Sequence, residues 1–64
     1  MRTLDYILDK RAITIAQLAE LSSLDQGRVE AITAGRWTAS PHERQQIVEA
    51  LDLTVKDVIW GHYM

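Results

Sequence analysis

Residues 22–41, SSLDQGRVEAITAGRWTASP, decide how the chain folds. The serine pair Ser22–Ser23 interrupts one helical segment, because serine side chains compete with the backbone for its hydrogen bonds. Asp25 then offers a carboxylate oxygen to the free amides of a new helix. Gly35 is suited to end that helix, since glycine adopts the left-handed conformation without strain. The stretch therefore predicts a tight turn followed by a helix over residues 25–34.

Two short helices are predicted before this turn. Thr3 is placed to cap the first, over residues 4–11, where apolar residues recur at helical spacing. Thr14 is placed to cap the second, over residues 15–21. Gln17 stands three residues after Thr14, so the two side chains match a reciprocal capping box.

Two further helices are predicted after the turn. Ser40 caps the fourth, Pro41 occupies its first position, where no amide is needed, and Glu43 completes a capping box. A fifth, shorter helix opens at Thr54. No segment alternates apolar and polar residues over a useful length, so no strand is predicted. The chain is therefore expected to be a single all-α domain, a compact five-helix bundle over residues 1–64. The residues expected to face its core are Leu4, Ile7, Leu8, Val29, Ile32, Ile47, Val48, Leu51, Val55, Val58 and Ile59.

Composition limits the possible functions. The chain has 64 residues, of which 47% are hydrophobic and 25% charged, the balance of an ordinary globular domain. No apolar run approaches the roughly 20 residues needed to span a bilayer, and no signal peptide is recognised, so we expect a cytoplasmic protein. Cysteine is absent and the two histidines, His42 and His62, are isolated, so we expect no metal and no cofactor. The net charge of −2 means that any binding to nucleic acid must be local.

The order of the motifs resembles the helix-turn-helix domain of the phage-repressor and Cro type, the XRE family, whose fold is described as lambda-repressor-like. The matching motifs, in chain order, are Ile13-Thr14, Leu18-Ala19, Leu24, the helix over residues 25–34, Gly35-Arg36 and Pro41. The helix-turn-helix covers about residues 14–34, and the likeness extends over nearly the whole chain. The resemblance implies binding to double-stranded DNA, with the third helix in the major groove.

Four residues depart from the family pattern. Ile15 stands where many members have a glutamine that contacts phosphate, and Ser23 stands where members usually have a glycine in the turn. Leu8 and Thr33 replace an Arg–Glu pair, and the loss of both partners together leaves no stranded charge. The fold is expected to tolerate these changes, while Ile15 removes a standard phosphate contact.

The third helix is predicted to present an outward side of low relief. With Val29 and Ile32 inward, the opposite side, at about 100° per residue, centres on Gly27, Ala31 and Ala34. A glycine inside a helix costs about 1 kcal/mol relative to alanine, so Gly27 indicates close approach by another molecule. The alternative interpretation is that Gly27 is simply tolerated on a solvent-exposed helix surface. Short side chains let a helix enter a groove about 12 Å wide.

Polar side chains beside this face are candidate DNA contacts. Gln26 is suited to adenine, Arg28 to guanine or phosphate, and Glu30 to a cytosine amino group, although Glu30 is equally an ordinary surface carboxylate. The loop candidates for the sugar-phosphate backbone are Arg36, Trp37 and Thr38. Trp37 packs over a deoxyribose or forms a lid on the core. The further candidate phosphate contacts are Thr14, Gln17 and Arg44. Residues 26–44 hold three arginines against two glutamates, a local balance of +1, and the other seven acidic residues all lie outside this segment.

Trp60 and Tyr63 are a candidate dimer interface. Trp60 is expected to project from the far side of the fifth helix, which Gly61 closes. One interpretation is a homodimer that sets two recognition helices about 34 Å apart on a palindromic site. The others are that these aromatics pack on residues missing from a fragment, or that Trp60 folds back on the first helix.

The sequence supports two classes of function. The first is a sequence-selective DNA-binding domain, a transcriptional repressor or regulator. The alternative is a helix-turn-helix fold used as a protein-protein interaction or antitoxin module, which the acidic composition and Ile15 favour. No nucleophile with a neighbouring histidine and no phosphate-binding glycine loop is present, so we expect no enzymatic activity.

Overall fold

Four α-helices follow one another within residues 2–60, the part of the chain that the computed structural model describes. None of these helices combines the length and the apolar character that a membrane crossing requires. A 3-10 turn and a two-residue strand follow the last helix, and this strand pairs with another at the start of the chain. The elements are β1 (Arg2–Thr3), α1 (Leu4–Arg11), α2 (Ile15–Ser22), α3 (Gln26–Thr33), α4 (Pro41–Leu51), η1 (Val55–Asp57) and β2 (Val58–Ile59).

The predicted helix starts are confirmed at α2 and α3. Thr14 Oγ1 accepts from the Gln17 N–H at 3.0 Å, and Gln17 Oε1 accepts from the Thr14 N–H at 2.8 Å. Asp25 Oδ2 accepts from the Arg28 N–H at 3.2 Å. Thr3 occupies the cap position of α1, but its side chain makes no capping hydrogen bond.

The helix ends are equally local in origin. Gly35 has φ 82°, the left-handed conformation that its position predicts. Ser23 takes the same conformation, with φ 62°, in the turn between α2 and α3. Ala12 and Asp52 do so after α1 and α4, with φ 56° and 59°. L-residues adopt this conformation at a cost of roughly 1–2 kcal/mol, so the packed core must stabilise these turns.

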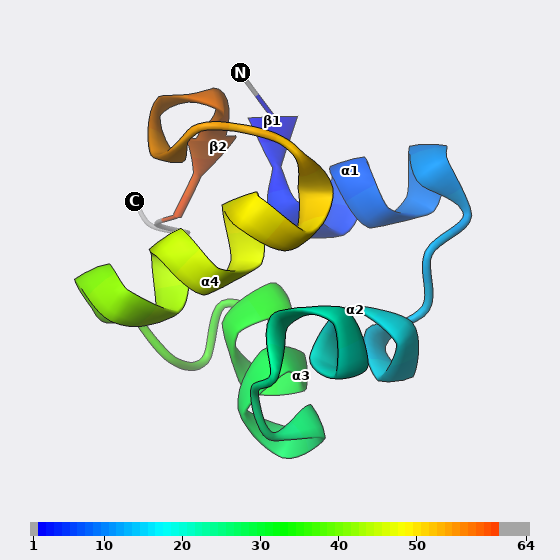
Figure 1. Cartoon of the computed structure of the whole chain (residues 1–64), viewed down its shortest axis with the longest axis vertical. Helices are drawn as coiled ribbons and strands as arrows, with labels where there is room; N and C mark the ends of the chain where they lie inside the picture. Colours follow the sequence, from blue (N-terminus) through cyan, green and yellow to red (C-terminus); the bar gives the residue numbers. More distant parts are fainter. Residues whose placement is uncertain (1, 61–64) are drawn as a thin grey trace.

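Helix α4 runs across the middle of the molecule, with α2 and α3 on one side and α1, β1 and β2 on the other (Figure 1). Side chains tie it to both sides. Arg11 Nη1 donates to the Leu51 carbonyl at 2.5 Å, and Gln46 Nε2 donates to the Ser22 carbonyl at 3.0 Å. The core lies between these elements. Its buried apolar residues are Leu4, Ile7, Leu8, Leu18, Ala19, Val29, Ile32, Ala39, Ile47, Val48, Leu51 and Val58.

The predicted fifth helix is wrong. The Thr54 N–H does donate to Asp57 Oδ2 at 3.0 Å, but this bond caps a single 3-10 turn, η1. The chain then extends, and Val58 pairs in parallel with Arg2. Val58 is buried while Ile59 is 39% exposed, so neighbouring side chains face opposite sides, as in a strand. The all-α prediction therefore holds for four helices and misses a two-stranded sheet, because the pairing partner is at the other end of the described chain.

Candidate nucleic-acid interface

Helix α3 lies at the end of the molecule opposite the strand pair (Figure 1). Val29 and Ile32 are buried, as predicted, with 0% and 2% of their surface exposed. On the other side Gln26, Gly27 and Glu30 are exposed. The turn between α2 and α3 spans residues 23–25, and the two helices pack on each other.

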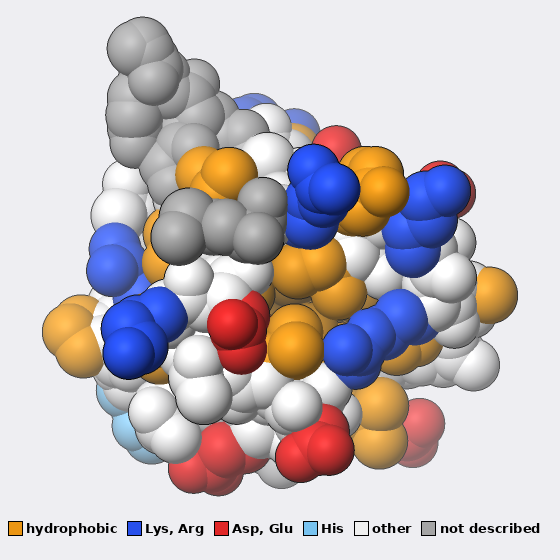
Figure 2. All heavy atoms as spheres, turned by 90° about the horizontal axis from the view of Figure 1, so that it is seen from above, with side chains coloured by type: hydrophobic (Ala, Val, Ile, Leu, Met, Phe, Trp, Pro, Cys, Tyr) orange, Lys and Arg blue, Asp and Glu red, His pale blue; other side chains and the backbone are white. Residues whose placement is uncertain are grey.

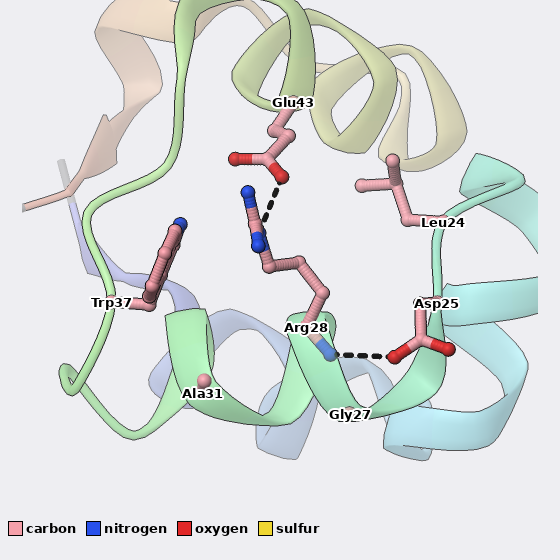
Figure 3. Close-up of a pocket in the computed structure, with 7 residues that line it drawn as sticks. All are labelled: Leu24, Asp25, Gly27, Arg28, Ala31, Trp37 and Glu43. Carbon is pink, nitrogen blue, oxygen red and sulfur yellow. Dashed lines mark hydrogen bonds and ion pairs between the residues drawn. The ribbon is translucent and has the colours of Figure 1, made fainter.

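A shallow hollow of about 530 Å³ lies beside this outward side of α3. Side chains from the turn before α3, from α3 itself, from the following loop and from α4 surround it (Figure 3). Its lining residues are Leu24, Asp25, Gly27, Arg28, Ala31, Trp37 and Glu43. The structure thus brings together four predicted DNA contacts, Gly27, Arg28, Ala31 and Trp37.

Arg28 is held inside this hollow. Its Nε donates to Glu43 Oε2 at 2.6 Å, and its guanidinium carbon lies 4.0 Å from the centre of the Trp37 ring (Figure 3). The sequence placed Arg28 at the flank of an outward face, free to reach a base or a phosphate. In the structure the side chain points toward α4 and its charge is paired with a carboxylate, and its contact with DNA stays a prediction.

Glu43 is a site residue that the sequence did not identify. Its Oε1 accepts from the Ser40 N–H at 2.8 Å, and the Ser40 hydroxyl accepts from the Glu43 N–H at 3.2 Å, which completes the predicted capping box. Only 8% of the residue is exposed. The backbone hydrogen bond from Ser40, with the neighbouring Arg28 guanidinium, lowers the pKa of Glu43, although burial acts in the opposite direction. Its capping position was visible in the sequence, but its second oxygen bonds a residue of another helix.

Gly27 has a reason within the chain for being glycine. A Cβ at this position would lie 3.1 Å from Asp25 Oδ2, the oxygen that caps α3. A side chain would therefore press on the cap, whether or not another molecule approaches. The glycine at this position therefore does not by itself indicate an outside partner.

The loop after α3 is held by its backbone. The N–H groups of Arg36 and Trp37 both donate to the Ala31 carbonyl, at 2.9 and 3.2 Å. Arg36 and Thr38 are exposed, as contacts to a phosphate backbone require. Trp37 is 47% exposed and stacks on Arg28, so it is not the core lid that the sequence allowed.

The side chains of the three further predicted phosphate contacts make interactions within the chain. Arg44 Nε donates to the Ala39 carbonyl at 3.0 Å, and the Arg44 guanidinium lies 5.7 Å from the Trp60 ring. The side chains of Thr14 and Gln17 bond to each other's backbone in the capping box of α2.

Trp60 does not project from a helix. It is partly buried against the core, and its Nε1 donates to the Val55 carbonyl at 3.1 Å. The expectation of an exposed Trp60 on a fifth helix is therefore wrong. Gly61 and Tyr63 lie outside the described residues. The dimer itself stays a prediction.

The end of the molecule with β1 and β2 carries several lysine and arginine side chains around exposed hydrophobic ones (Figure 2). Arg2 and Lys10 lie over the Tyr6 ring, at 5.1 and 5.5 Å from its centre. With Arg11 they line a second hollow of about 330 Å³, which Asp57 also borders. The surface away from α3 thus carries basic as well as acidic side chains.

Comparisons of the chain with protein-family models, with curated proteins and with solved structures gave no significant match. The chemistry and placement of the side chains described above are therefore the basis on which a function can be assigned.

Proposed function

We propose that this chain binds double-stranded DNA sequence-selectively through the outward side of α3, as a transcriptional repressor or regulator of the phage-repressor and Cro type. The observation that carries the proposal is the packing of α2 on α3 across the turn at residues 23–25. That packing leaves α3 at one end of the molecule (Figure 1), with Gln26, Gly27 and Glu30 exposed on its outward side. In helix-turn-helix proteins the second helix of such a unit lies in the major groove.

The side chains of α3 and its loop divide into two kinds of DNA contact. Gln26 and Glu30 are exposed on the side that faces the groove, where an amide suits adenine and a carboxylate suits a cytosine amino group. Arg36 and Thr38 are exposed in the following loop, where they are placed to contact phosphates. Gly27 adds no bulk that would hold the helix away from the bases.

The charge of this surface predicts weak attraction to phosphate. Arg28 is neutralised by Glu43, which leaves Arg36 as the exposed cation of the loop and Glu30 as an opposing carboxylate on α3. Each phosphate contact contributes a slope of about −0.9 to the logarithm of affinity against the logarithm of salt concentration. We therefore expect a shallow salt dependence that corresponds to few phosphate contacts.

Titration of duplex DNA at two salt concentrations tests the proposal, with random and genomic sequences compared. Arg36→Ala should weaken binding and make the salt slope shallower by about 1. Lys10→Ala removes an equal charge beside Tyr6, at the other end of the molecule, and should change neither. Absence of binding to every duplex, or equal effects of the two substitutions, would refute the proposal.

A second candidate function is a protein-protein interaction or antitoxin module. Two observations favour it: the basic hollow around Tyr6, and Leu21, which is 60% exposed on α2. If the chain binds protein instead, it should not bind duplex DNA in the same titration. The substitution Arg36→Ala should then have no effect on the titration.

A further inference from the structure

The Arg28 side chain is fixed on two sides. Glu43 Oε2 accepts from Nε at 2.6 Å, and the Trp37 ring covers one face of the guanidinium at 4.0 Å (Figure 3). The Arg28 side chain nevertheless keeps 40% of its surface exposed, while the Glu43 side chain keeps 10%. The carboxylate is therefore the buried anchor, and the guanidinium is the group that remains accessible.

Most of the donors of Arg28 remain unused within the described residues. A guanidinium has five N–H groups, and the hydrogen bond to Glu43 uses the one on Nε. The four N–H groups on the two terminal nitrogens form the fork that matches the O6 and N7 acceptors of guanine. An unrestrained arginine side chain loses rotamer entropy when it binds a ligand. A side chain that a carboxylate and an aromatic ring already hold, as in Arg28, has lost much of this entropy before binding.

Pairing also changes what Arg28 is suited to bind. The Arg28–Glu43 pair has no net charge, so it attracts phosphate far less than a free arginine does. Hydrogen bonding to a neutral base edge does not require net charge. The pair is therefore better suited to select a base than to hold the DNA backbone.

The hollow gives the guanidinium a route to the groove. Gly27 and Ala31 line it together with Arg28, and neither has a side chain long enough to cover the guanidinium. The hollow adjoins the outward side of α3 at Gly27 and Ala31, which belong to the proposed DNA-facing surface (Figure 3).

We propose that Glu43, in the first turn of α4, is a specificity-determining positioning residue that holds the Arg28 fork for recognition of one guanine. This inference rests on the proposed DNA binding. It assigns part of the sequence selectivity to α4, through a carboxylate that touches no base.

Glu43→Gln isolates this role. Glutamine at the same position also completes a capping box, so α4 keeps its start while the charge that fixes Arg28 is lost. The probe is a duplex selected by the wild-type chain from a random library, in which each guanine in turn is replaced by 7-deazaguanine, which lacks the N7 acceptor. Affinities are measured for both chains at several salt concentrations.

The wild-type chain should lose about tenfold in affinity at one replaced guanine. Arg28→Ala should abolish that difference. Glu43→Gln should reduce it to less than about threefold and should make the salt slope steeper by about 1, because the released arginine then pairs with a phosphate. Glu20→Gln makes the same charge change on an exposed part of α2, and the guanine preference should be retained.

Undiminished guanine discrimination by Glu43→Gln would overturn the inference, and so would a wild-type preference that survives Arg28→Ala. If the wild-type chain binds no duplex at all, the proposed function fails and this inference fails with it. A structural role alone would lower the stability of Glu43→Gln and leave the guanine preference and the salt slope as in the wild type.

Discussion

Arg28 and Glu43 are fifteen residues apart in the sequence, yet Arg28 Nε lies 2.6 Å from Glu43 Oε2. This contact joins the outward helix α3 to the first turn of α4. Because Glu43 also accepts from the Ser40 N–H, one carboxylate both starts α4 and fixes a side chain of α3. The orientation of the Arg28 side chain therefore depends on a residue outside α3.

Removing the Glu43 carboxylate should destabilise the fold by two separable amounts. Glu43→Ala loses both the capping box and the partner of Arg28, at a cost of about 2 kcal/mol. Glu43→Gln keeps the cap and should cost about half as much. Urea denaturation followed by circular dichroism measures both. Equal losses for the two variants would contradict the separate role of the charge.

The stability of the chain should fall in acid through Glu43. Its pKa in the folded chain lies below its ordinary value of 4.5, so its stabilising contribution is complete above that value and is lost as the pH falls through the folded pKa. The hydrogen bonds from Thr54 lower the pKa of Asp57 too, which adds a contribution of the same sign. Glu43→Gln should therefore flatten, without abolishing, the fall of the thermal midpoint below about pH 4.5. An unchanged pH profile would show that Glu43 is not the responsible group.

The sequence predicted those parts of the fold that are decided within a few residues. The caps at Thr14, Asp25 and Ser40 and the left-handed Gly35 all depend on side chains or backbone three or four positions away. The pairing of Arg2 with Val58 depends on two ends of the chain meeting, and no local pattern encodes that.

The sequence likewise predicted some features of the candidate site and not others. The outward position of Gln26 and Gly27 follows from helical periodicity and the inward apolar residues, so the sequence was sufficient. The direction of Arg28 was not predictable from α3 alone, because a carboxylate of α4 and the ring of Trp37 determine it.

Ala12→Gly should stabilise the chain. Ala12 has φ 56°, a conformation that costs an L-residue roughly 1–2 kcal/mol and glycine nothing. Glycine also has more freedom in the unfolded chain, so the net gain should be about 0.5 kcal/mol. Ala16→Gly, at an exposed position inside α2, is the matched control and should cost about 1 kcal/mol. Loss of stability in both variants would contradict the left-handed turn after α1.

Trp60→Phe tests whether Trp60 finds its partner within its own chain. The substitution keeps an aromatic ring but removes the hydrogen bond from Nε1 to the Val55 carbonyl, so stability should fall by about 1 kcal/mol. Sedimentation should give the same mass for the variant and the wild type. A lighter variant with unchanged unfolding would instead support the homodimer through Trp60.

Amide chemical-shift mapping with duplex DNA tests whether the outward side of α3 is the surface that binds. We predict that the shifts concentrate in residues 26–38 and in the first turn of α4. If those amides stay undisturbed while residues 2–11 around Tyr6 respond, α3 is not the DNA-binding helix.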